Sequence, residues 1–238
     1  MIKTRKSQAM GVAVAALVCL LGALALATVR SASGGTAKAT ERPSAAPVPV
    51  SASAFAFHNA MRKLWEDHIT YTRNVVISFE LNDPHPKVVL PDLSTVVDRL
   101  LQNQVDIGDA IKPYYGTDAG NQLTALLKEH INGAAKVLTA LKTNDDAALK
   151  AALEAWYANA HDIAVFLSNA NPENWPLAEM DQMMKDHLDL TTAEAVARHG
   201  EDWGADVAAY DKVHGQALGM ADMLSDGIID QFPAKFRP

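Results

Sequence analysis

Apolar residues recur at intervals of three and four from Ala54 to the end of the chain, and this periodicity limits the fold more than any other feature. No stretch sustains the alternation of apolar and polar residues that marks a strand, and the short apolar run at 88–90 is too brief to found a sheet. We therefore predict an all-α protein, an up-and-down helical bundle with about four core helices and one or two accessory helices packed alongside.

Residues that interrupt helices divide this region into six predicted helices. The boundaries expected from them are Asn82-Asp83-Pro84 after the first helix, Pro113 after the second, Asn144 as the N-cap of the fourth, Asn171-Pro172 after the fourth, Gly200 after the fifth and Pro233 after the sixth.

The N-terminal part of the chain has the composition of a targeting segment followed by a linker. Residues 1–33 place a basic start before an uncharged apolar run at 9–29, which is typical of a secretory signal or of an uncleaved membrane anchor. Residues 34–53 are rich in Ala, Pro, Ser, Gly and Thr, as linkers are. We expect residues 54–238 to form one exported domain, periplasmic or extracellular, either free or held at the inner membrane by residues 9–29.

Charge and cysteine content exclude several classes of function. The formal net charge is −7, and the basic start of the chain makes the remainder more acidic still, which disfavours nucleic acid as a partner. Cys19 is the one cysteine, so the predicted domain has no disulfide and no Cys-ligated metal. No phosphate-binding glycine loop, nucleophile elbow or His-Glu-x-x-His motif is present, so an acid–base enzyme ranks third among our hypotheses.

Histidines interrupt the apolar stripes of four predicted helices near their midpoints. His68, His130, His187 and His214 would lie at one height in an up-and-down bundle and could converge on one layer of the core. Metal sites in helical bundles are formed by side chains such as imidazoles on facing helices. This pattern therefore predicts a transition-metal site for iron, copper or zinc. Asp211, three residues before His214, would be a carboxylate ligand. Haem held by two histidines is a less favoured alternative.

Further polar residues on the same stripes are predicted to surround a bound ligand. They are Thr72, Asn103, Asn159, Thr191 and Glu194. Methionines near His187 and His214 would suit copper, although methionine is more often core filler.

Other interpretations remain open on the sequence alone. A single buried histidine is usually a satisfied core residue, so the runner-up hypothesis is a non-catalytic structural or interaction module of the cell envelope with a buried histidine hydrogen-bond network. Asp67-His68-Ile69 with Thr72 matches Asp186-His187-Leu188 with Thr191, which indicates either an internal duplication or a chance match. A homo-oligomer is also compatible with the sequence.

Three motifs resemble a family of bacterial exported helical proteins for which no function is established. They are Leu64-Trp65-Glu66-Asp67-His68 with Thr72-Arg73, His187-Leu188 with Thr191 and Glu194-Ala195, and Met220-Ala221-Asp222-Met223 with Gln231-Phe232-Pro233. The resemblance covers about residues 58–236 and implies a histidine and carboxylate cluster that includes His68, His130 and His187. Some members carry glycosyltransferase or acetylglutamate kinase labels, which we discount because no nucleotide-binding pattern or α/β alternation is present.

Overall fold

The computed structural model describes residues 51–81 and 91–237, so the predicted targeting segment and nearly all of the predicted linker lie outside the described residues. The described part is helical and contains no strand, which confirms the all-α fold class. Its elements are α2 (Ala52–Leu81), α3 (Leu93–Tyr115), α4 (Thr117–Thr143), α5 (Asp146–Ala170), α6 (Leu177–His199), α7 (Trp203–Gln231) and the short 3-10 helix η1 (Pro233–Lys235).

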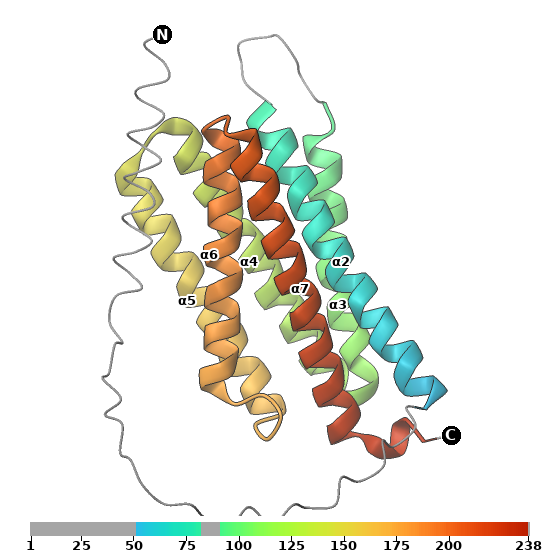
Figure 1. Ribbon diagram of the computed structural model, residues 1–238. Helices are drawn as coiled ribbons and strands as arrows, with labels where there is room; N and C mark the ends of the chain where they lie inside the picture. Colours follow the sequence, from blue (N-terminus) through green and yellow to red (C-terminus); the bar gives the residue numbers. More distant parts are fainter. Residues whose placement is uncertain (1–50, 82–90, 238) are drawn as a thin grey trace, which may run out of the picture.

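The six long helices run up and down in chain order and close on themselves (Figure 1). Each helix packs against the next one in the chain, and α7 returns to pack along α2. The alternate helices α2, α4 and α6 run in the same direction and also contact one another across the interior. All six contribute buried side chains, so the expected division into about four core helices and one or two accessory helices is not confirmed.

A close approach between α3 and α4 depends on two glycines. A Cβ atom at Gly108 of α3 would lie 2.5 Å from the carbonyl oxygen of Gly120 in α4, and a Cβ at Gly120 would lie 2.5 Å from the carbonyl oxygen of Gly108. Any larger residue would therefore push the two backbones apart. This contact fixes α3 and α4 at one end of the bundle.

Two predicted helix boundaries are wrong, and both have a local cause. Helix α3 passes Pro113 and ends at Tyr115, because a proline within the last turn removes only one of the final helical hydrogen bonds. Asn144 is not an N-cap: it adopts the left-handed conformation that ends α4 (φ 56°). Asp145 caps α5 instead, accepting a hydrogen bond from the Ala148 amide at 2.9 Å. Gly200 ends α6 as predicted.

In residues 51–81 and 91–237, no helix combines the length and the apolar character that crossing a membrane requires.

Candidate functional site

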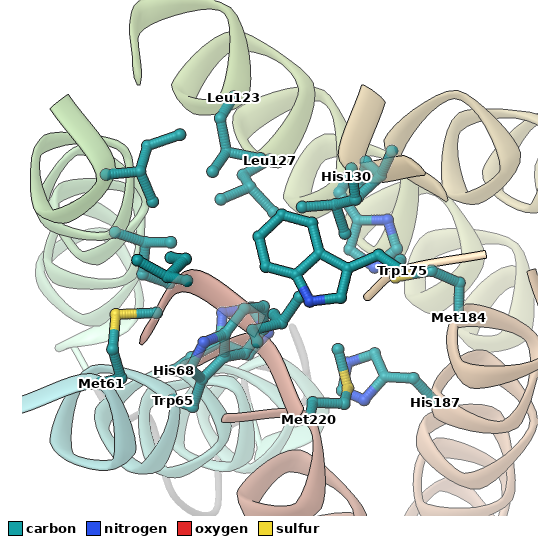
Figure 2. A pocket seen from close by; sticks show the side chains of 16 residues that line it. Met61, Trp65, His68, Leu123, Leu127, His130, Trp175, Met184, His187 and Met220 are labelled. Atoms are coloured by element: carbon teal, nitrogen blue, oxygen red, sulfur yellow. The ribbon is translucent and has the colours of Figure 1, made fainter. Parts of the chain in front are cut away.

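Three of the four predicted histidines meet in the middle of the bundle. His68 of α2, His130 of α4 and His187 of α6 are each no more than 4% exposed. The ring centroids of His68 and His187 are 5.9 Å apart, and those of His130 and His187 are 6.3 Å apart. Figure 2 shows the three imidazoles entering from three separate helices. We call these three residues the histidine layer.

Each histidine of the layer is paired with an amide side chain from the following helix. His130 Nδ1 bonds Asn159 Oδ1 of α5 at 2.9 Å, and His187 Nδ1 bonds Gln216 Oε1 of α7 at 2.9 Å. In both pairs the amide lies 29 residues after the histidine. The same arrangement therefore recurs in the α4–α5 and α6–α7 hairpins.

The amide nitrogens determine which ring nitrogen carries the proton. Asn159 Nδ2 donates to the Leu126 carbonyl and Gln216 Nε2 donates to the Met183 carbonyl, each four residues before the paired histidine. A carbonyl oxygen only accepts, so each amide must turn its own oxygen toward the imidazole. Nδ1 of His130 and of His187 is therefore the N–H donor, and each Nε2 carries a lone pair. Ligating histidines are commonly held in this way by a partner on the other nitrogen.

The α2–α3 hairpin repeats the pattern with two amides. Asn103 Nδ2 donates to the Leu64 carbonyl, again four residues before the histidine, and the Asn103 side chain hydrogen-bonds His68. Gln104 Nε2 lies 3.3 Å from His68 Nδ1, but it has shorter contacts with the Leu100 carbonyl and with Asn103 Oδ1. Its two hydrogens suffice for those two acceptors. His68 therefore lies against two amide side chains of α3, those of Asn103 and Gln104.

A small cavity, the central cavity, lies against the histidine layer (Figure 2). The centre of a water-sized sphere can occupy ≈ 30 Å³ of it, which is room for one to three waters or one metal ion with a small ligand. No charged side chain lines it. Its walls comprise Met61, Trp65, His68, Ile107, Ile111, Leu123, Leu127, His130, Ile163, Leu167, Trp175, Met184, His187, Met220, Leu224 and Ile228.

The layer holds polar atoms that lack hydrogen bonds. His130 Nε2 and Trp65 Nε1 are buried and have no partner among the described residues. Leaving a buried polar atom unpaired costs about 1–3 kcal/mol, so such atoms call for an explanation such as a bound ion or water.

Burial also keeps the three imidazoles neutral. The pKa of His68 is lowered to about 3, chiefly by removal from water and then by the nearby His187 and His130, while the Gln104 and Asn103 hydrogen bonds oppose the shift. Burial likewise lowers the pKa of His130 to about 3 and lowers the pKa of His187. The rings are therefore neutral at neutral pH, so each has one nitrogen with a lone pair and a metal ion need not displace the second proton of an imidazolium.

The layer as it stands is slightly wider than a closed metal site. Three imidazoles bound to one ion at about 2.0–2.1 Å hold their ring centroids roughly 5–5.5 Å apart. The two measured separations exceed this by less than about 1 Å. In keeping with this, no group of three or more His, Cys, Asp or Glu within residues 51–81 and 91–237 is already placed to hold a metal ion.

His214 does not join the layer, contrary to the expectation that its helix would turn it inward. It is half-buried on the surface of α7, 3.7 Å from Glu66 Oε1 and packed against the Tyr210 ring. Asp211, its predicted partner, is exposed. Gln216, two residues after His214, occupies the inward position instead.

The predicted ligand-surrounding residues are divided among three places. Asn103 and Asn159 contact the layer directly. Thr72 and Thr191 donate to the carbonyls of His68 and His187 and line a second cavity of ≈ 70 Å³ on the opposite side of the layer. Glu194 lines neither of these cavities.

Glu194 belongs to a buried group of charges that joins α2, α6 and α7. We call Arg73, Glu194, Arg198 and Asp206 the ion cluster. Arg73 donates to Glu194 Oε1 at 2.8 Å and pairs with Asp206, which also accepts from Arg198 at 3.2 Å. Burial raises the pKa of Glu194 although Arg73 opposes it, whereas burial of Asp206 is outweighed by Arg73 and Arg198, so its pKa is lowered.

Gln104 and Gln216 are the site residues that the sequence did not reveal. The spacing offers a signal for one of them, since Gln216 follows His187 by the interval at which Asn159 follows His130. The interval identifies Gln216 only once the hydrogen bond between Asn159 and His130 is known.

Comparison with known proteins returns no match for this chain among family models, curated proteins or solved structures. The resemblance to the family of exported bacterial helical proteins stays a prediction.

Proposed function

We propose that this protein binds one transition-metal ion between Nε2 of His68, His130 and His187. The observation that carries the proposal is the recurring amide partner, which holds Nδ1–H outward and leaves an Nε2 lone pair on rings that line one small cavity. A core that only needed packing would not require three polar rings at one height.

The chemistry of the donor set fits an ion. Three neutral imidazoles form a ligand set used for zinc and copper, and lowered pKa values remove competition from protons. Binding needs the separations from His187 to His68 and from His187 to His130 to shorten by about 1 Å or less. We place this function outside the cytoplasm on the basis of residues 1–33, whose composition is that of a targeting segment.

The test is metal binding by the full-length protein, purified without chelator and then given Zn²⁺, Fe²⁺ or Cu⁺ separately. We expect close to one ion per chain by plasma mass spectrometry after gel filtration. His187→Gln is expected to lower the affinity by at least tenfold, because it removes one of three ligands.

His161→Gln is the matched control, because His161 lies on the surface of α5 and pairs with Asp181. It should leave stoichiometry and affinity unchanged. Equal metal content in the wild-type and His187→Gln proteins would contradict the proposal, provided that circular dichroism shows both folded.

One observation favours a second function, a structural module with a buried histidine–amide network. The three imidazoles already have one amide partner each, and the described residues contain no preformed three-ligand group. This alternative predicts that none of the three ions binds and that His187→Gln lowers thermal stability without any effect on metal content.

A further inference from the structure

Three thioethers share the central cavity with the histidine layer. Met61 of α2, Met184 of α6 and Met220 of α7 line it, and each is no more than 4% exposed. They come from three different helices, as Figure 2 shows. Thioether sulfur is a soft donor that favours monovalent copper over zinc or iron.

The charge around the cavity favours a monovalent ion for a separate reason. Every side chain that lines the cavity is uncharged at neutral pH, and the nearest buried carboxylates, Glu194 and Asp206, are committed to arginines in the ion cluster. The cost of burying an uncompensated ion rises with the square of its charge, so a monovalent ion costs roughly a quarter as much as a divalent one.

The number of ligands that each ion requires also favours monovalent copper over zinc. A tetrahedral zinc centre with three histidines keeps a fourth position for water or hydroxide, which needs polar neighbours. Among the side chains that line the central cavity, Trp65 Nε1 is the one N–H donor without a partner, and apart from the histidines the other walls are aliphatic, aromatic or thioether. Monovalent copper needs no anionic ligand, and a methionine can complete a three-histidine site as a weak fourth ligand.

We infer that the ion of this site is monovalent copper, held by the three imidazoles with Met184 or Met220 as the additional soft ligand. This inference rests on the proposed function, since it names the ion for the same histidines.

The experiment compares two ions on the same variants of the full-length protein. Cu⁺ is supplied anaerobically from a chromophoric chelator complex, Zn²⁺ is titrated against a second chelator, and the affinities are obtained by competition. Leucine is close to methionine in volume, so Met184→Leu, Met220→Leu and the double variant should remain folded. Met180→Leu is the matched control, because Met180 is fully buried on α6 one turn from Met184 and does not line the cavity.

We expect the double variant to lose at least tenfold in Cu⁺ affinity with no change in Zn²⁺ affinity, and Met180→Leu to change neither. Sulfur scattering in the X-ray absorption spectrum of the Cu⁺-loaded wild-type protein is the expected second readout, and it needs no variant to fold. Zinc bound through His187 together with unchanged Cu⁺ affinity in the double variant, or a copper spectrum without sulfur, would overturn the copper inference and leave the metal site standing. If neither ion binds in a way that depends on His187, both proposals fail.

Discussion

This bundle buries polar side chains in two regions, and the two regions compensate the loss of water in different ways. The ion cluster brings two arginines and two carboxylates together, so its charges compensate one another. One oxygen of Glu194 is left without a hydrogen bond. The histidine layer contains neutral rings, each satisfied on one nitrogen by an amide and facing a cavity. The charges of the first arrangement are balanced within the fold, whereas the second leaves lone pairs that face a cavity and are available to a ligand.

Burial of a polar side chain is therefore not enough to mark a functional site in this protein. Glu194 is fully buried and lies on the helix that carries His187, yet its partner Arg73 occupies it. The layer is the candidate site because its rings line a cavity with space for an ion and one of their nitrogens, His130 Nε2, is buried without a partner. The following predictions probe the two regions in order of decreasing effect.

The largest effect is expected from acid on the metal-free histidine layer. The unfolded chain protonates these rings near pH 6.5, but His68 and His130 in the folded protein stay neutral down to about pH 3. The unfolded state then binds more protons, so the free energy of unfolding falls as the pH falls below 6.5, by about 1.4 kcal/mol per pH unit for each histidine.

Urea denaturation at pH 7 and at pH 5 measures this. We expect a loss of about 2 kcal/mol from each of His68 and His130 over that interval, and His130→Gln should remove its own share of about 2 kcal/mol. A wild-type stability that does not change between the two pH values would show that the rings are not held neutral.

Arg73→Leu tests the ion cluster. It leaves two buried carboxylates without their main partner, so we expect a loss of about 3–5 kcal/mol in the free energy of unfolding. Arg99→Leu removes an arginine whose ion pair with Asp67 is far more exposed, and it should cost about 1 kcal/mol or less. Metal affinity should be unchanged in both, and its loss in Arg73→Leu would mean that the two regions are coupled.

Asn159→Leu tests the amide partner of the layer without touching a proposed ligand. The variant loses the acceptor for His130 Nδ1–H, so the ring is no longer held in the ligating orientation and metal affinity should fall about 10–100-fold. Calorimetric titration measures the change. Gln102→Leu, an exposed amide on α3 that bonds Asp106, should bind metal as the wild type does. If Asn159→Leu and Gln102→Leu bound metal with equal affinity, Asn159 would have no role in orienting His130.

His214→Gln should have the smallest effect. His214 is half-buried on the surface beside Glu66, so we expect a change in unfolding free energy of at most about 0.5 kcal/mol and an unchanged metal content. Plasma mass spectrometry and thermal denaturation check both quantities, and loss of the ion in this variant would restore His214 to the site.

The helical pattern was sufficient to predict the fold class and, with Gly200, part of the boundaries. It gave the wrong boundary where a residue type can either begin or end a helix. Asn144 is suited both to begin a helix and to end one in the left-handed conformation, and Asp145 beside it is the better N-cap. The closure of α7 onto α2 depends on contacts between distant segments, which periodicity does not encode.

The histidine layer was predictable in three of its four proposed members, because His68, His130 and His187 sit at the middle of apolar stripes. His214 was misplaced because the buried face of α7 follows Ala209, Val213 and Ala217, which leaves His214 beside that face and partly exposed. Hydrogen-bond partners from neighbouring helices depend on helix register, so Gln104 and Gln216 could not be inferred.

The most direct test of the central claim is the protonation and ligation of the three rings, observed by long-range ¹H–¹⁵N NMR of the histidine side chains. For metal-free protein at pH 7, we predict the Nδ1–H form at His130 and His187, with an unprotonated Nε2. One equivalent of Cu⁺ or Zn²⁺ should then shift the Nε2 resonances of all three and leave His161 unmoved. Rings protonated on Nε2 in the metal-free protein, with no shift on addition of either ion, would contradict the account.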